Sequence, residues 1–281
     1  MKSVRASCIP DFQVLMSNET NYHPYPLLRS SEGDRTMLCV SPLHGRSYVV
    51  DKVGERYIVS KGNGLSYSQY TFMNTREFGD DTWGLLLKSD AFRDFELGNE
   101  ISKLGIKTNH MEYVLELNQS IQLSTGHILK PILLQYDVEC PFRIADAPFM
   151  SREQMYNEAI KWKSVDKWNC PNNYLIAANI LIENLRILHE NDILHNAIHS
   201  QNYTWALELL DFELSYSKSH PYSREDDRRH VKDLFPREII QTYEIITFIA
   251  GALHEDIDYQ LVDNLFIENG FDINALNVCS K

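Results

Sequence analysis

The sequence has little cysteine, and none of it is arranged as a covalent or metal-bound scaffold would require. Its five cysteines are scattered, with no CxxC pair and no cluster of histidines at metal-ligand spacing. This usage fits unpaired thiols in a reducing cytosol. We therefore expect neither a disulfide framework nor a zinc site.

Long hydrophobic runs are also missing. The first twenty residues lack the apolar core of a signal peptide. No stretch approaches the roughly 18 uninterrupted apolar residues that a membrane-spanning helix needs. We therefore expect a cytoplasmic protein that does not use a membrane as a partner.

Positive charge is in short supply as well. The chain carries 39 acidic and 27 basic residues, which gives a formal net charge of -12. A field of that sign repels a polyanion, so nucleic acid is not an expected partner. At 281 residues and 43% hydrophobic content, the chain can still bury the core of one two-lobed domain or two small ones.

The periodicity of the apolar residues changes near residue 150. Before it, short β-rich runs predict a hairpin over 46–64 and later strands in MEYVLELN and ILKPILLQYDV. One helical pattern, DAFRDFELGNEISKLGI, interrupts these strands and stops at Gly105. The order is typical of many α+β proteins.

After residue 150 the pattern is helical. Ser151 and Gln154 form an SxxQ capping box, Asn172 or Asn173 can cap the next helix, and Pro236 can open a later one. We predict an α+β chain with an N-terminal extension (1–45), a β-rich small lobe with one helix (46–150) and a mainly helical large lobe (151–281).

The segment LHENDILHNAIHSQNYTWALELLDFELS, residues 188–215, carries the strongest chemical signal. An amide oxygen from Asn202 and a carboxylate from Asp211, brought together by adjacent loops, could hold Mg²⁺ against the phosphates of ATP. Asn and Asp are also common turn residues. The alternative is that Asn202 shapes a turn and Asp211 caps a loop.

A second signal lies upstream, where Lys61 ends a predicted strand. Its ammonium group can hold phosphates as a point charge. Gly62 and Gly64 can let backbone amides approach an anion. The alternative is a surface lysine beside a hairpin glycine.

The 188–215 segment resembles the catalytic segment of protein kinases. His195-Asn196-Ala197 stands at the H-R-D position, Asn202 follows Ala197 by five residues, and Asp211-Phe212-Glu213 stands at D-F-G. The resemblance implies a two-lobed protein-kinase-like fold that binds ATP and Mg²⁺. It also implies that Lys61 pairs with an acid on the small-lobe helix, and gives His195 a structural role.

A closer resemblance is to the selenoprotein O family of protein adenylyltransferases, whose kinase fold transfers AMP. KGNGLSYS is similar to that family's KGSGxTxYS element, and HNAIHSQN to its HGVMNTDN loop. Its REF helix, which ends in LGI, aligns with 93–106 and places Asp94 opposite Lys61. Arg143 in CPFRI then corresponds to a phosphate-binding arginine. High-persistence-type toxin kinases, which share a similar small-lobe helix, are an alternative relative.

Three departures from these patterns bear on catalysis. No GxGxxG loop precedes Lys61, and Glu213 replaces the glycine of D-F-G. Ala197 and Gln201 occupy the two positions at which the relatives carry aspartate, and neither side chain can accept a proton. His199 is the candidate base in their place. Its alternative is an exposed loop histidine.

Two functions follow from these residues. The first is an ATP- and Mg-dependent transferase that moves AMP or phosphate to a protein or small-molecule acceptor. The second is a nucleotide-binding pseudokinase that serves as a regulatory or interaction module, which Ala197 and Glu213 favour. A kinase-fold interaction protein without nucleotide is a third reading, and the retention of Lys61, Asn202 and Asp211 argues against it.

Overall fold

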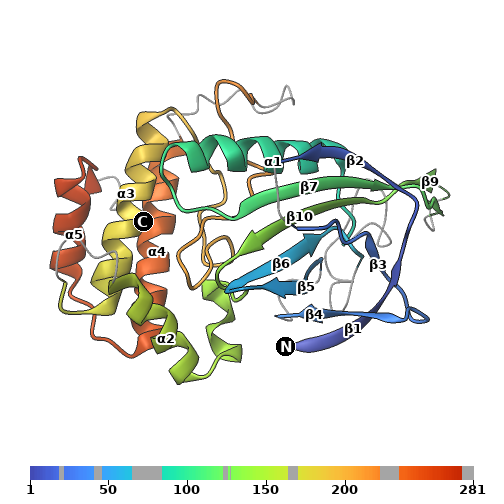
Figure 1. Ribbon diagram of the computed structural model, residues 1–281. Helices are drawn as coiled ribbons and strands as arrows, with labels where there is room; N and C mark the ends of the chain where they lie inside the picture. The colour runs from blue at the N-terminus through green and yellow to red at the C-terminus, as the bar shows by residue number, and fades with distance from the viewer. Residues whose placement is uncertain are drawn as a thin grey trace. The chain divides into compact units, whose positions relative to one another are not determined.

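The computed structural model describes residues 1–18, 22–40, 46–64, 84–122, 126, 128–163, 170–221 and 234–273. It divides into two compact units, the first formed by 1–99 and 109–142 and the second by 100–108 and 143–281. The first unit is rich in β-strands and the second in helices, so the predicted α+β class is confirmed (Figure 1). The two units are described separately below.

The first unit contains an eight-stranded sheet in the order β2-β7-β10-β6-β5-β4-β1-β3 (Figure 1). Its register pairs are antiparallel throughout. The strands are β1 Lys2–Cys8, β2 Phe12–Ser17, β3 Leu27–Arg29, β4 Arg35–Cys39, β5 Ser47–Val53, β6 Arg56–Lys61, β7 His110–Leu117 and β10 Ile132–Val138. A separate two-stranded sheet pairs β8, Ile121–Gln122, with β9, Ile128–Leu129.

Strands β1 to β4 belong to the main sheet, although residues 1–45 were expected to form an extension. β1 pairs with both β3 and β4, and β4 joins β5 at Leu38 and Val49. Their apolar side chains form one buried cluster with the central strands: Val4, Ala6, Leu27, Met37, Cys39 and Tyr48. Short runs of alternating polar and apolar residues gave too weak a pattern to place these strands.

The predicted hairpin is present as β5 and β6, and the two later predicted strands are β7 and β10. β10 is buried along its whole length, as expected for a strand inside the sheet, although it contains the polar residues Gln135 and Asp137. The predicted helix is α1, Lys88–Lys103. Gly105 follows it with a φ of +87°, a left-handed conformation that glycine adopts at little cost at a helix end.

The helices of the second unit follow from their capping residues. The Ser151 hydroxyl accepts from the Gln154 N–H at 3.1 Å, and the Gln154 side chain accepts from the Ser151 N–H at 2.8 Å, so the predicted capping box is confirmed. Pro236 lies in the first turn of its helix, as predicted. The elements are η3 Ile144–Phe149, α2 Arg152–Trp162, α3 Asn173–Glu190, α4 Phe235–Leu253 and α5 Tyr259–Glu268.

Helices α3 and α4 pack side by side and form the core of this unit (Figure 1). The start of α3 differs from expectation, because Asn172 makes no side-chain capping bond. The carboxylate of Glu255 accepts instead from the backbone N–H groups of Asn173, at 3.2 Å, and Tyr174, at 2.9 Å. Among the described helices, none is long and apolar enough to cross a membrane.

Candidate nucleotide-binding and catalytic residues

In the first unit, Lys61 forms a buried ion pair with Asp94. Lys61 is the last residue of β6, and Asp94 lies on α1; the two residues are 2% and 1% exposed. The Lys61 Nζ is 2.8 Å from the Asp94 Oδ2. The predicted choice of Asp94 is confirmed, whereas Glu100 accepts hydrogen bonds from Ser217 and Ser219. A paired, buried lysine replaces the surface lysine considered as the alternative.

Gly62 and Gly64 have a backbone explanation. Both have a φ of +97°, and a Cβ on Gly62 would lie 2.3 Å from the Ile132 carbonyl oxygen. The Gly62 N–H donates to the Arg46 carbonyl at 2.9 Å, and the Gly64 N–H donates to the Gly84 carbonyl at 3.0 Å. Both amides therefore donate to backbone carbonyls, and the expected role of these glycines in approaching a phosphate stays a prediction. The remainder of KGNGLSYS, from Leu65, lies outside the described residues.

In the second unit, the loop from His195 to Asn202 is held by its own polar groups. The buried His195 ring contacts the Leu210 carbonyl at 2.9 Å through Nε2 and meets Phe212 edge-on. The Asn202 Nδ2 donates to the Ala197 carbonyl at 3.0 Å. His195 therefore has the structural role expected of it, and Asn202 closes the loop on itself.

Arg143 contacts this loop directly. Its Nη1 donates to the Gln201 carbonyl at 2.6 Å and to the Asn202 Oδ1 at 3.3 Å. Arg143 is 8% exposed, and its backbone N–H donates to the Asp146 side chain at 2.8 Å. These contacts orient the Asn202 amide. They use only some of the five N–H donors of the guanidinium.

Asp211 follows a short antiparallel turn of the chain. Tyr203 and Leu209 form an antiparallel bridge, and the Leu210 N–H donates to the Asn202 carbonyl at 2.9 Å. These bonds bring the backbone before Asp211 beside Asn202. Asp211 itself has a φ of +69°, which is uncommon for a residue other than glycine and is often found at functional positions.

Glu213 is close to Asp211. An oxygen of each carboxylate lies within 4.8 Å of the other, and both residues are partly buried. The sequence presented Glu213 only as a charge that replaces the D-F-G glycine. The structure makes it a candidate metal ligand, because two neighbouring carboxylates repel each other unless a cation or a proton lies between them.

His199 lies within the same loop. Its Nδ1 accepts from the Gln201 N–H at 3.2 Å, and its carbonyl accepts from the Asn202 N–H at 2.8 Å. Burial, followed by the charges of His195 and Arg143, lowers the pKa of His199, against an opposing effect of Asp211. The imidazole is partly buried and neutral over a wider pH range than usual, so it differs from the exposed loop histidine considered as the alternative.

Glu238 is a site residue that the sequence analysis missed. This buried residue of α4 accepts the Asn196 N–H at 2.6 Å through Oε1, and its Oε2 lies 3.0 Å from the His189 Nε2. Asn196 has a φ of +65° and so depends on such support. Glu238 is 42 residues away from Asn196 in the sequence, so no short motif predicts this contact. The mixed charge run of 223–235 lies largely outside the described residues.

Comparisons with known proteins give a structural likeness only. No family model matches the sequence, and no curated protein matches it. Among solved structures, the chain is similar to a specific rhoptry antigen kinase domain from Toxoplasma gondii, with 12% sequence identity and a TM-score of 0.42. That match covers 85% of this chain and 76% of the other.

Proposed function

We propose that this chain is an ATP- and Mg²⁺-dependent transferase of protein-kinase-like fold. It moves phosphate or AMP to a hydroxyl group of a protein or small molecule. The observation that carries the proposal is the buried pair between the Lys61 ammonium and the Asp94 carboxylate, 2.8 Å apart. Protein kinases use a lysine on a strand and an acid on the following helix in this way.

The physical cost of this pair supports a functional reason for it. Removing an ammonium and a carboxylate from water costs several kcal/mol per ion, and their attraction often fails to repay that cost. Two apolar side chains packed at these positions would join the sheet and the helix without the free-energy cost of removing two charges from water. A lysine held rigidly by one carboxylate has its charge oriented in advance for an anion such as a nucleotide phosphate.

Residues of the second unit supply the proposed metal ligands. Asp211 is the principal ligand, Glu213 is the added one, and the Asn202 amide oxygen is the third. Bound Mg²⁺ would neutralise phosphate charge and orient the transferred group. Arg143 keeps the Asn202 side chain in one orientation through its 3.3 Å contact with Oδ1.

The reaction has no carboxylate base in its loop. The acceptor hydroxyl attacks the γ or the α phosphorus, and the leaving group is ADP or pyrophosphate respectively. The hydroxyl proton passes to the His199 imidazole or to solvent. General-base assistance is worth about 10² to 10⁴ in rate, less than positioning and charge neutralisation supply together.

The second candidate function is a pseudokinase that binds nucleotide without transferring it. Ala197 favours it, because a methyl group stands where kinases carry the catalytic aspartate. The two functions use the same nucleotide-binding residues. They differ in whether phosphate or AMP is transferred from the bound nucleotide to an acceptor.

Incubation with ATP labelled at the α or the γ position distinguishes them. Transfer of label from ATP labelled at the γ phosphate to a protein or small-molecule acceptor indicates a kinase. Transfer of label from ATP labelled at the α phosphate indicates AMP transfer. Lys61→Met should abolish either transfer, and Lys130→Met, at an exposed site, should not. Binding of Mg-ATP without any transfer identifies the pseudokinase. No binding refutes both.

The role of His199 has its own test. His199→Gln should lower turnover by about 10² while ATP binding stays the same. An unchanged turnover would assign His199 to loop structure alone. Catalysis would then depend on positioning and charge.

A further inference from the structure

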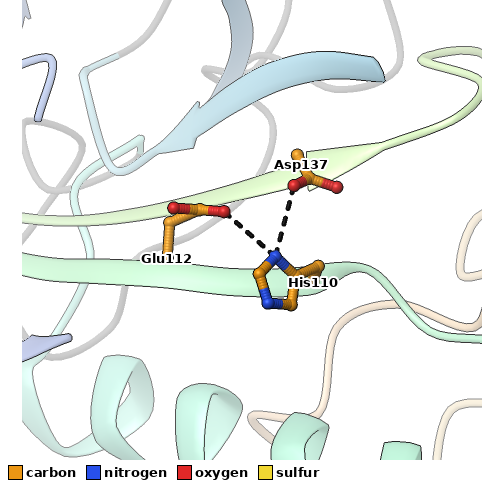
Figure 2. Close-up of side chains that lie close together, drawn as sticks. All are labelled: His110, Glu112 and Asp137. Atoms are coloured by element: carbon orange, nitrogen blue, oxygen red, sulfur yellow. Dashed lines mark hydrogen bonds and ion pairs between the residues drawn. The ribbon is translucent and has the colours of Figure 1, made fainter. Parts of the chain in front are cut away.

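A second polar cluster lies in the β-sheet of the first unit and shares no residue with the proposed nucleotide site. His110 and Glu112 lie on β7, and Asp137 lies on the adjacent strand β10 (Figure 2). Glu112 and Asp137 are 0% and 2% exposed, whereas the His110 side chain is 51% exposed. Two carboxylates buried in the sheet need a compensating positive charge.

The strand register explains why these groups meet. Asp137 is paired directly with His110, and Glu112 is two residues along β7 from His110. The register shifts between Gln135 and Tyr136, so that β7 contains Glu112 as an extra residue opposite them. Such a bulge changes the direction of a side chain and often occurs beside functional sites.

The three side chains converge on one imidazole nitrogen. The His110 Nδ1 lies 3.0 Å from the Glu112 Oε1 and 3.3 Å from the Asp137 Oδ2 (Figure 2). The remaining oxygen of Asp137 accepts from Arg56, whose Nη1 also lies 3.3 Å from Glu139. The charge of Arg56 is therefore shared between Asp137 and Glu139.

One carboxylate oxygen in the cluster lacks a partner. The Glu112 Oε2 is buried, and it has no hydrogen bond within the described part of the chain. Hydrogen bonds to Asp137 and Glu112 raise the pKa of His110 to about 9, so the imidazolium form balances part of their charge, and a metal ion would have to displace that proton.

We propose that His110, Glu112 and Asp137 form a binding site for a divalent transition-metal ion, with zinc as the best fit. One imidazole and two carboxylates are a borderline ligand set of the kind that zinc accepts, whereas Mg²⁺ prefers oxygen ligands and retained water. This zinc site was not expected from the sequence. His110 and Glu112 are two residues apart on β7, but Asp137 comes from the separate strand β10, so the three ligands share no single sequence motif.

The spacing of the ligand atoms suits zinc. Bonds of about 2.0 to 2.2 Å in a tetrahedral shell place neighbouring ligand atoms about 3.3 Å apart. The two measured separations, 3.0 and 3.3 Å, are close to that value. The half-exposed ring of His110 gives an ion access from solvent, and a water molecule can complete the shell.

Calorimetric titration of the chelator-treated full chain with zinc chloride tests the site. The wild type should bind one zinc ion with an affinity of about 10⁻⁶ M. His110→Gln and Glu112→Gln should each weaken that binding at least tenfold. Glu116→Gln removes the same charge from the same strand outside the cluster, and it should bind zinc like the wild type.

Two further measurements keep this test decisive. Asp211→Asn should retain zinc binding, because Asp211 belongs to the proposed nucleotide site. Circular dichroism checks that each variant is folded, and the exposed position of His110 makes His110→Gln the safer of the two cluster variants. If folded His110→Gln binds zinc like the wild type, or the wild type binds none at about 100 μM, the cluster is an imidazolium ion pair and the proposal is wrong.

Discussion

At the scale of single residues, the Lys61–Asp94 pair makes the sharpest prediction about stability. Asp94→Asn leaves a buried ammonium without its charged partner, and it should lower the free energy of unfolding by about 3 kcal/mol. The double variant Lys61→Met/Asp94→Asn should lose less than the sum of the two single variants, because the two groups are coupled. Urea denaturation measures both.

Asp192→Asn is the matched control for that experiment. Asp192 forms a surface ion pair with Lys218, and such pairs contribute little. Its removal should leave the urea midpoint unchanged. Equal midpoints for Asp94→Asn and the wild type would mean that Lys61 and Asp94 are not a buried pair in solution.

Glu238 gives a second prediction at this scale. Glu238→Ala removes the acceptor for the Asn196 N–H and should cost about 2 kcal/mol, because a buried donor loses its bond. Glu238→Gln keeps an oxygen at that position and should recover most of the stability. Thermal denaturation compares the two. A Gln variant as unstable as the Ala variant would assign the effect to the lost charge.

Contacts between distant residues were predictable only where a family resemblance aligned the segments that carry them. Lys61 and Asp94 could be assigned as a pair because the helix that carries Asp94 resembles that of the selenoprotein O family at equal length. Glu238 and His110 could not, because their partners depend on how α4 approaches a loop and how β7 pairs with β10. No short sequence motif predicts the contact between Glu238 and Asn196 or the contact between His110 and Asp137.

At the scale of elements, the start of α3 depends on Glu255. Glu255→Ala removes a carboxylate that accepts from Asn173 and Tyr174, and it should cost about 1 kcal/mol or more at this helix N-terminus. Asn172→Ala should have little effect, because its side chain makes no capping bond. Melting temperatures that fall equally for both variants would contradict this assignment.

The elements themselves show where sequence patterns are informative. Long periodic segments gave α1, α3 and α4, and the turn between β5 and β6 gave a hairpin. Strands β1 to β4 were not predicted, and their register is set by their neighbours in the sheet. The cluster that β1, β3 and β4 form with Tyr48 makes these strands part of the first unit's core.

At the scale of the whole molecule, two sets of charged residues have different proposed roles. We propose that the Asn202–Glu213 segment holds Mg²⁺ for a nucleotide. We propose that His110, Glu112 and Asp137 hold a transition metal that joins β7 to β10. Magnesium and zinc should therefore act independently, which the Asp211 and Glu112 variants can separate.

Calorimetry tests the proposed binding of Mg-ATP through Asp211. The wild type should bind ATP only when Mg²⁺ is present, and Asp211→Asn should weaken that binding tenfold or more, about 1.4 kcal/mol. Asp192→Asn should bind like the wild type. Unchanged affinity in folded Asp211→Asn, or no binding of Mg-ATP by the wild type at millimolar concentration, would show that Asp211 does not hold a nucleotide-bound metal ion.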